Sequence, residues 1–383
     1  MNNQLSVQKC LDYDKKHVYE ALVELLQPFG GINAIIKPNA RVLIKPNMLS
    51  CKSPERAATT HPSVIEELAK LCYEAGAKKV LIGDSPPAIF GKTEDFWKTT
   101  GFADAAKNSG AELVSFESSE KIPVEFKTNG QDLVAYVTKE LYNADCVINL
   151  SKMKTHNLTR ITGAVKNNFG FIPGFSKGLW HRTFPRAEQF AEFIVDFARK
   201  LPVSFNIMDG ITAMDSQGPA SGRVVEPHVL LAAFSPVNID IGFCNIIGLD
   251  PLQVPYLKYC KKSGWWPENS DMLKYVGEPF EKVKYKGYIV PPTPPTALIP
   301  EFVINIARKL IRSVPHLTGK CIKCGRCAKI CPAKAINISD KQAEFDYTKC
   351  ISCFCCMEVC PAEAIKMKSS PLLDIYMKIR KLK

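Results

Sequence analysis

Eight of the fifteen cysteines follow one short spacing pattern that occurs twice in the C-terminal part of the chain. Each copy reads Cys-x2-Cys-x2-Cys-x3-Cys-Pro. The first begins at Cys321 and the second at Cys350, 29 residues later. The repeat extends past the cysteines, because Cys-Pro-Ala-Lys-Ala-Ile over 331–336 matches Cys-Pro-Ala-Glu-Ala-Ile over 360–365. Thiols this closely spaced are typical of metal ligands, so the segment is predicted to fold as two related halves around metal centres.

The spacing favours iron–sulfur clusters over zinc. A zinc site uses two separated Cys-x2-Cys pairs around one tetrahedral ion, which leaves a repeat of four-cysteine motifs unexplained. The run resembles the bacterial two-cluster ferredoxins, in which the fourth cysteine of each motif binds the other motif's 4Fe–4S cluster. The first cluster is expected to bind Cys321, Cys324, Cys327 and Cys360. The second is expected to bind Cys350, Cys353, Cys356 and Cys331, with Cys355 left as a buried or weakly exposed thiol.

Cysteine usage and charge restrict the class of protein. Fifteen is an odd number and residues 1–10 contain no apolar signal-peptide core, so a secreted disulfide scaffold is not expected. The apolar stretch 229–249 is interrupted by Pro236, Asn238 and Asp240, so no transmembrane segment is predicted. A cytoplasmic protein with reduced cysteines is the prediction. The +12 net charge forms no basic stripe with interleaved aromatics, so no nucleic-acid partner is expected.

The first 250 residues alternate short apolar runs with helical patterns. Apolar runs centred on 42–44, 80–82, 146–148, 205–207 and 229–231 predict strands, and helices are expected at 17–27, 63–75, 187–200 and 238–247. This order predicts an α/β fold with a mostly parallel sheet covered by helices on both faces. A small α+β ferredoxin-like domain should follow it. No Gly-x-Gly-x-x-Gly follows a strand, so an ordinary dinucleotide fold is not supported.

Composition suggests where the domains end. The α/β domain is assigned to residues 1–286, and a proline-rich linker with an amphipathic helix near 301–313 to residues 287–318. The two-cluster domain is assigned to 319–369 and a basic helical tail to 370–383. Residues 319–383 hold thirteen Lys or Arg and six Asp or Glu. This net positive charge favours an acidic electron carrier such as ferredoxin or flavodoxin as a partner.

Polar residues follow the predicted strands where a parallel sheet binds ligands. The first four strands run into Lys45-Pro-Asn47, Gly83-Asp84-Ser-Pro, Ser151-Lys152-Met-Lys154-Thr-His156 and Asp209-Gly210. A later stretch carries Lys166, Asn167, Asn168 and Gly170, where glycine and asparagine alternate with basic residues. These residues predict a site for an anionic small molecule, although a basic surface loop is the alternative.

These motifs resemble the domain of unknown function family 362, many of whose members carry a two-cluster ferredoxin domain. The resemblance rests on Val42–Asn47, Ala58–Pro62, Gly83–Pro86, Lys154–His156, Gly163–Gly174 and Met208–Gly210. It implies an iron–sulfur protein of anaerobic redox metabolism and leaves the reaction unnamed. It carries the family's motif positions onto Lys45, Asn47, His61, Asp84, Lys154, His156, Lys166, Asn167 and Asp209.

A second similarity concerns lactate racemases, which tether a nickel-pincer nucleotide through a lysine and bind its nickel with a histidine. His156, Lys166 and His181 occur here in a similar order, and Lys166 precedes Pro173-Gly174. The spacing is loose, so this is an analogy. His61 precedes Pro62 and is read as either functional or a helix cap.

Three functions are compatible with the sequence. The preferred one is an oxidoreductase, a reductase that transfers electrons between two 4Fe–4S clusters and a ligand at the strand ends. The alternatives are a non-enzymatic ferredoxin-type carrier or adaptor and a nickel-pincer enzyme. The candidate catalytic residues are Lys166, His156, His61 and Asp84. The candidates for binding an additional cofactor, nucleotide or anion are Lys45, Asn47, Lys152, Lys154, Asn167, Asn168, Gly170, Asp209 and His181.

Overall fold

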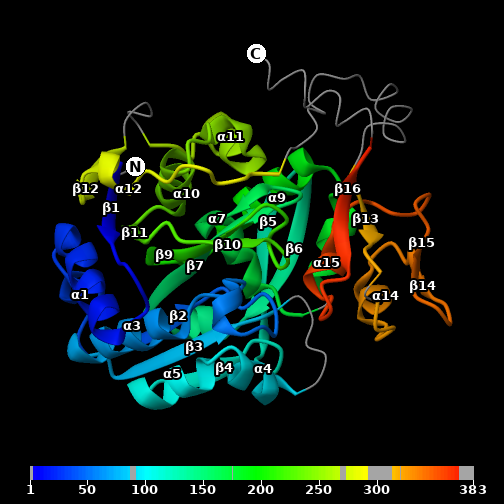
Figure 1. The fold of residues 1–383 in the computed structure, drawn as a ribbon. Coiled ribbons are helices and arrows are strands. Elements are labelled where there is room, and N and C mark those ends of the chain that lie inside the picture. Colours follow the sequence, from blue (N-terminus) through cyan, green and yellow to red (C-terminus); the bar gives the residue numbers. More distant parts are fainter. Residues whose placement is uncertain are drawn as a thin grey trace.

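A large mixed sheet forms the centre of the N-terminal domain (Figure 1). The computed structural model describes residues 3–86, 92–174, 176–267, 273–291, 313–319 and 321–370. In spatial order the main strands are β12 (Lys274–Gly277), β1 (Gln4–Lys9), β11 (Val229–Ala233), β9 (Phe205–Asp215), β7 (Cys146–His156), β2 (Arg41–Lys45), β3 (Lys79–Asp84) and β4 (Glu112–Ser115). Two short strands extend the sheet, β8 (Arg160–Thr162) beside β7 and β10 (Arg223–Val225) beside β9.

The sheet confirms the predicted α/β class. The run β9-β7-β2-β3-β4 is parallel, whereas β11 pairs antiparallel with both β9 and β1. The central strand β2 reads Arg-Val-Leu-Ile-Lys, and its last four residues are buried. Continuous apolar strands of this kind are typical of a sheet with both faces covered.

Helices cover both faces of the sheet. On one side lie α1 (Lys15–Leu26), α3 (Pro62–Glu74), α4 (Thr93–Thr99) and α5 (Phe102–Ser109). On the other lie α7 (Ala164–Asn167), α8 (Ser176–Thr183), α9 (Ala187–Ala198), α10 (Pro236–Ile246) and α11 (Pro255–Lys262) (Figure 1). Short helices α2 (Ile32–Ile35), α6 (Glu140–Asn143) and α12 (Phe280–Val283), with the hairpin β5 (Lys121–Thr128) and β6 (Gln131–Thr138), complete the domain. Two separate buried apolar clusters fill the two faces.

Two strands continue through residues that the sequence analysis placed in loops. β7 includes Lys152, Lys154 and His156, and β9 includes Asp209. A run of polar residues after an apolar stretch usually indicates the end of a strand, but all eleven residues of β7 are buried. The strand continues because β8 pairs with it and its polar groups find partners inside the protein. The register between β7 and β9 shifts between Lys152 and Lys154, so the ammonium groups of these two lysines lie in different surroundings.

The C-terminal module has the repeat that the sequence predicts. Its elements are β13 (Ser313–Leu317) paired with β16 (Ile365–Ser369), β14 (Ile336–Ile338) paired with β15 (Ala343–Phe345), and helices α14 (Arg326–Ile330) and α15 (Cys355–Glu358). Left-handed backbone occurs at matched positions in both halves: Lys323 and Ser352, Gly325 and Phe354, Lys334 and Glu363. Each pair is 29 residues apart, so the halves share a backbone path as well as a sequence pattern.

The segment between the domains differs in part from the expected linker. Residues 313–317 form β13, so the small sheet includes residues that the sequence analysis assigned to the linker. The start of that linker packs on β9, because Ser216 N donates to Ile289 O at 2.7 Å and Ile289 N donates to Asp215 Oδ2 at 2.9 Å. Residues 301–312 of the predicted linker helix and the tail beyond residue 370 lie outside the described residues. Within the described ranges, no helix is long and apolar enough to cross a membrane.

Candidate functional site

A cavity of about 660 Å³ lies where the α/β domain meets the C-terminal module. From the α/β domain it is lined by three lysines, Lys154, Lys166 and Lys177, and by Asn47, Met48, Leu49, Asp84, Ser85, Thr162, Asn167, Phe169, Gly170, Gly178, His181 and Pro219. From the C-terminal module it is lined by Ile330, Cys355 and Glu358. This volume includes the open mouth of the cavity as well as its enclosed part.

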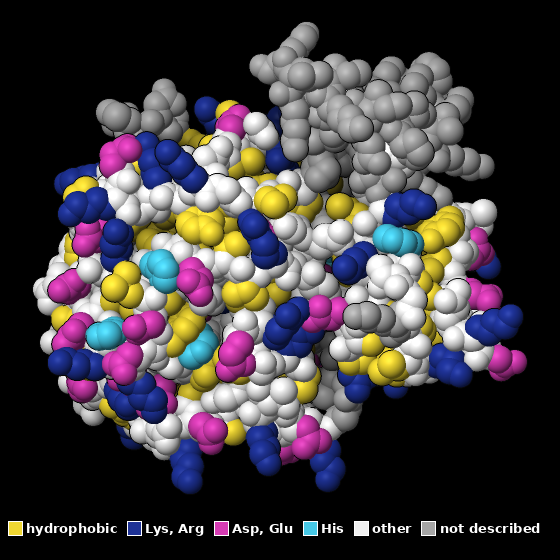
Figure 2. Space-filling view, in the orientation of Figure 1, with side chains coloured by type: hydrophobic (Ala, Val, Ile, Leu, Met, Phe, Trp, Pro, Cys, Tyr) yellow, Lys and Arg dark blue, Asp and Glu magenta, His cyan; other side chains and the backbone are white. Residues whose placement is uncertain are grey.

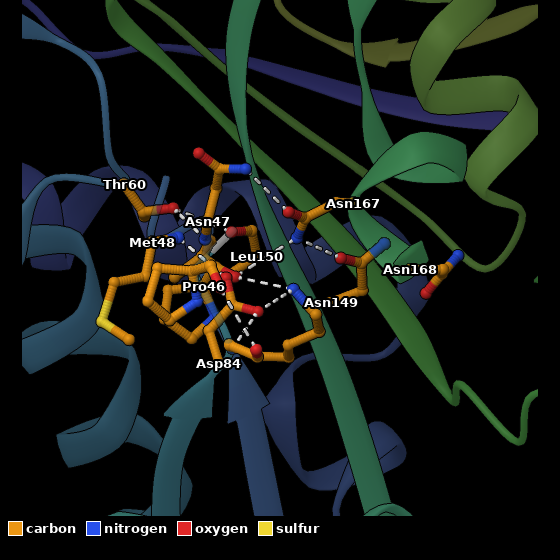
Figure 3. Close-up of polar contacts among 12 residues, drawn as sticks. Pro46, Asn47, Met48, Thr60, Asp84, Asn149, Leu150, Asn167 and Asn168 are labelled. Atoms are coloured by element: carbon orange, nitrogen blue, oxygen red, sulfur yellow. Dashed lines mark hydrogen bonds and ion pairs between the residues drawn. The ribbon is translucent and has the colours of Figure 1, made fainter. Parts of the chain in front are cut away.

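The strand ends β2 and β3 meet at a buried ion pair beside this cavity. Lys45 Nζ lies 2.8 Å from Asp84 Oδ1, and both side chains are almost fully buried. Asp84 also accepts hydrogen bonds from Met48 N and Ser85 N, each at 2.8 Å (Figure 3). Because the oxygens of Asp84 are engaged in these bonds, this carboxylate holds the two strand ends together while facing the cavity.

Gly170 is required by this ion pair. A Cβ at position 170 would lie closer than 3.0 Å to both Lys45 Nζ and Asp84 Oδ1. We therefore expect Gly170→Ala to disrupt the pair and destabilise the protein by about 3 kcal/mol, since breaking a buried ion pair costs that much. The measurement is the urea midpoint of the anaerobic holoprotein. Gly178→Ala is the matched control, because its Cβ would meet only ordinary contacts at 3.7 and 3.9 Å, and its midpoint should not fall.

Three lysines give the cavity a positive wall. Among the described residues none of Lys154, Lys166 and Lys177 forms an ion pair with a carboxylate. Burial lowers the pKa of all three, that of Lys177 to about 8. Lys177 Nζ donates to Ser85 O and Ser85 Oγ, whereas no hydrogen bond to Lys166 Nζ is found in the described part of the chain. Buried cations without partner anions are typical of a site that binds an anion.

Lys154 is held by a chain of buried amides. Its Nζ donates to Asn47 Oδ1 at 2.6 Å and to Ala58 O at 2.7 Å. Asn47 Nδ2 donates to Asn167 Oδ1 at 3.0 Å, and Asn167 Nδ2 donates to Asn149 Oδ1 at 2.7 Å (Figure 3). Asn168 is buried nearby, with Nδ2 donating to Ala164 O at 3.3 Å. The predicted residues Asn47, Lys154 and Asn167 therefore form one connected network.

The two histidines of the racemase analogy occupy different positions. His181 lines the cavity, stacks on Phe190 with ring centroids 4.3 Å apart, and has a buried Nδ1 without a partner. His156 does not line the cavity. Its Nδ1 accepts hydrogen bonds from Leu158 N and Thr159 N, so its proton is on Nε2. This Nε2 lies 3.4 Å from Glu358 Oε1. Burial lowers the pKa of His156 to about 4 and of His181 to about 3, so both rings are neutral at pH 7.

Three other predicted residues lie in a separate cluster. Lys152 Nζ lies 2.8 Å from Asp209 Oδ2, and both side chains are fully buried. Tyr13 OH donates to Asp209 Oδ1 at 2.9 Å, and its ring stacks on His61 with centroids 3.5 Å apart. His61 caps α3 by accepting from Ser63 N at 3.2 Å. The cavity lining contains none of His61, Lys152 and Asp209, and the contacts that they make stabilise this part of the fold.

Charged and polar contacts join the two modules. Glu363 lies 2.8 Å from Lys52 Nζ and 2.7 Å from Arg56 Nη2. Met367 N donates to Gln217 Oε1 at 3.1 Å. With the His156–Glu358 pair, these contacts fix the C-terminal module against the ends of β7 and β9 (Figure 1).

The motif cysteines surround two further cavities in crossed sets. One, of about 330 Å³, is lined by Cys321, Cys324, Cys327 and Cys360. The other, of about 320 Å³, is lined by Cys331, Cys350, Cys353 and Cys356, together with Cys355. The fourth cysteine of each motif accepts a matching hydrogen bond: Ala335 N donates to Cys331 Sγ and Ala364 N to Cys360 Sγ, both at 3.3 Å. Eight thiols in two apolar-walled cavities fit two 4Fe–4S clusters.

Sequence reasoning missed the residues that the C-terminal module contributes to the large cavity. Glu358 occupies a variable position between Cys356 and Cys360, and Ile330 precedes Cys331, so the motif gives no signal for either. Cys355 was noted only as a thiol outside the pattern, and it lines both the large cavity and the cavity of Cys331. Lys177 lines the cavity as well, although it was not among the candidate residues.

The chain is similar to one protein in sequence and to two solved structures in fold. The chain is 31% identical over 284 residues to a thylakoid-associated protein of Synechocystis sp., covering 74% of this chain and 86% of the relative. A crystal structure of a Thermotoga maritima protein matches at 15% identity with a TM-score of 0.39, over 67% of this chain and 60% of that one. The lactate racemase apoprotein of Thermoanaerobacterium thermosaccharolyticum matches at 14% identity with a TM-score of 0.41, over 63% and 56%.

Family models match both parts of the chain. Residues 320–364 match a 4Fe–4S dicluster domain, which agrees with the paired cysteine cavities. Residues 42–245 match a domain of unknown function, DUF362, and this range contains β2, β3, β7 and β9, the strands around the candidate site. The protein therefore belongs to the DUF362 family and carries an iron–sulfur dicluster domain after its α/β domain.

Proposed function

We propose that this protein is an oxidoreductase, a reductase that exchanges electrons with an anionic small molecule or cofactor bound in the cavity between its two modules. One observation carries the proposal: Cys355 lines both this cavity and the neighbouring cavity of Cys331, Cys350, Cys353 and Cys356. The 4Fe–4S clusters supply one-electron transfer when bound. A ligand in the large cavity would be separated from the second set of cysteines by little more than this side chain.

The residues of the α/β domain would bind and orient that ligand. Lys154, Lys166 and Lys177 offer positive charge, and Asn47 and Asn167 offer amide groups. Phe169, Pro219 and Ile330 supply apolar walls that limit access of water. Charge favours an anion here, because the three lining lysines outnumber the lining carboxylates Asp84 and Glu358, and Asp84 is already paired with Lys45.

The cluster bound by Cys321, Cys324, Cys327 and Cys360 would exchange electrons with an external carrier. Its cavity is lined by Ile322, Lys323 and Cys324, all exposed, and it shares no lining residue with the large cavity. On the described surface of the module, apolar side chains form a stripe flanked by charged ones (Figure 2). This apolar stripe, together with the net positive charge of residues 319–383, suits a small acidic carrier such as a ferredoxin or flavodoxin.

Reversing one rim charge should slow electron entry. We expect Lys323→Glu to lower the rate of reduction by reduced flavodoxin about three- to tenfold at low salt, because charge complementarity steers encounter. The difference should shrink at high salt, while reduction by dithionite stays unchanged. Stopped-flow bleaching of the cluster absorbance is the measurement. Lys16→Glu on α1, whose side chain is 79% exposed, is the matched control and should behave as the wild type.

The proposed reaction is tested with anaerobic holoprotein whose clusters have been reduced. Fractionated anionic metabolites are added, and the return of the oxidised absorbance is followed. Reoxidation by one fraction, lost in Lys166→Met, supports the reductase. Reoxidation by protein carriers alone would instead support the carrier or adaptor. A cytoplasmic location is part of the proposal, because all fifteen cysteines, each within the described ranges, are free.

A further inference from the structure

The amide chain that begins at Lys154 extends farther into the sheet than the cavity does. Asn149 Nδ2 donates to Asn206 Oδ1 at 2.9 Å, and Asn206 Nδ2 donates to Phe234 O at 2.9 Å. Together with Asn47, in the loop after β2, and Asn167, the last residue of α7, these two asparagines link the Lys154 ammonium to a backbone carbonyl. Figure 3 shows the bonds that join Asn47, Asn167 and Asn149. Asn149 and Asn206 are fully buried and do not line the cavity.

The two ends of this chain fix the orientation of every amide in it. An ammonium group can only donate, and a backbone carbonyl oxygen can only accept. Each asparagine must therefore present its oxygen toward Lys154 and its NH₂ toward Phe234. The remaining hydrogens of the inner amides are also engaged, since Asn149 Nδ2 donates to Ala164 O at 2.9 Å and Asn167 Nδ2 to Pro46 O at 3.4 Å.

Two donor hydrogens are left over at the cavity end. Lys154 Nζ makes two hydrogen bonds, to Asn47 Oδ1 and Ala58 O, and has a third hydrogen. Asn47 Nδ2 donates once, to Asn167 Oδ1, and has a second hydrogen. Both residues line the cavity, where Lys166 adds further donors. A group that accepts hydrogen bonds can use these free hydrogens when it binds against this edge.

The chain also stabilises the positive charge of Lys154. Amides hydrogen-bonded head to tail in a dry interior polarise one another, so the partial negative charge on Asn47 Oδ1 increases with each amide behind it. That oxygen is the nearest polar partner of Lys154 and stands where a carboxylate would stand in an ordinary ion pair. It stabilises the protonated lysine without cancelling its charge.

We propose that the free hydrogens of Lys154 Nζ and Asn47 Nδ2 form an oxyanion subsite for a carboxylate or phosphate group. We further propose that Asn149 and Asn206 are positioning residues that set its strength from inside the sheet. The inference rests on the proposed ligand cavity and names the chemical group that the cavity selects. It adds two residues that no sequence motif indicates.

The test measures anion binding without any redox reaction. Inorganic phosphate and acetate are titrated separately into oxidised anaerobic holoprotein by calorimetry, which distinguishes the two kinds of oxyanion. Asn206→Leu should weaken the better-bound probe about tenfold, because it removes the end of the polarised chain. Ser204→Ala is the matched control. Ser204 directly precedes β9, and its Oγ accepts a hydrogen bond from Val147 N of β7 at 3.0 Å. Because Ser204 is not part of the amide chain, this variant should bind the anion as tightly as the wild type does.

A double-mutant cycle separates positioning from loosening of the sheet. In a Lys154→Met background, Asn206→Leu should have no further effect on anion affinity, whereas general loosening would weaken binding to the remaining lysines as well. Asn206→Ser keeps a hydroxyl near Phe234 O and provides a milder change if the leucine variant fails to fold. The inference is overturned if neither anion binds the wild type, or if both Asn206 variants bind as tightly as it does. If an anion binds but no metabolite fraction reoxidises the clusters, the proposed reaction is refuted while the anion subsite stands.

Discussion

Holoprotein carrying Cys331→Ala together with Cys350→Ala should keep one complete cluster, about four of eight irons, although the two substitutions fall in different motifs. Both thiols line the same cavity, so removing both damages a single site. Cys331→Ala with Cys324→Ala should instead lose both clusters, although these two cysteines belong to one motif, because they line different cavities. Iron and sulfide analysis, with electron paramagnetic resonance of the reduced protein, measures the difference.

All of these variants are made in a Cys355→Ser background. Cys355 lines the second cavity and would otherwise be available to replace a missing ligand there. The opposite pattern, with one cluster retained in Cys331→Ala/Cys324→Ala and none in Cys331→Ala/Cys350→Ala, would show that each motif binds its own cluster. That result would contradict the crossed arrangement and the position of the second cluster beside the large cavity.

Lys166→Met should lower ligand-dependent reoxidation of the reduced protein by about 100-fold, equivalent to roughly 3 kcal/mol of lost charge-assisted binding. Lys166 Nζ faces the cavity, and the described part of the chain offers it no hydrogen-bond or ion-pair partner. Burial lowers its pKa, which means that the fold gives its charge an unfavourable environment. The variant should be about as stable as the wild type, because it removes a buried charge but also loses the attraction between that charge and Glu358.

Two controls define this outcome. Lys16→Met makes the same substitution on the exposed face of α1, and it should leave both the reoxidation rate and the stability unchanged. Cluster content must match the wild type in each variant. A reoxidation rate for Lys166→Met within twofold of the wild type, with the same fraction of reduced clusters, would show that this cation does not serve the ligand.

Local patterns predicted the fold and the grouping of the motif cysteines. Continuous apolar strands such as 42–44 and 80–82 mark a covered parallel sheet, and the structure has them in β2 and β3. The cysteine spacing predicted which thiols gather together, and the two cavities contain the expected sets. In both cases the information lies within short stretches of sequence, whose geometry depends little on distant parts of the chain.

The division of the polar residues between two places could not be predicted in the same way. Lys152 and Lys154 are two residues apart, yet one pairs with Asp209 and the other bonds Asn47 beside the cavity. A register shift in β7 produces this separation, and shifts of this kind depend on pairing with β9. Asn206 and Glu358 reach the site from distant segments, so only the tertiary structure reveals their contacts.

The central claim is that electrons meet a ligand in the cavity beside Cys355. Freeze-quench electron paramagnetic resonance tests it most directly, using fully reduced holoprotein mixed with the metabolite fraction that reoxidises it. The cluster bound through Cys331, identified by comparison with the Cys331→Ala/Cys350→Ala protein, should lose its reduced signal on mixing, and Lys166→Met should delay that loss. Reduced signals that persist with every small anion and disappear only when a protein carrier is added would contradict the account.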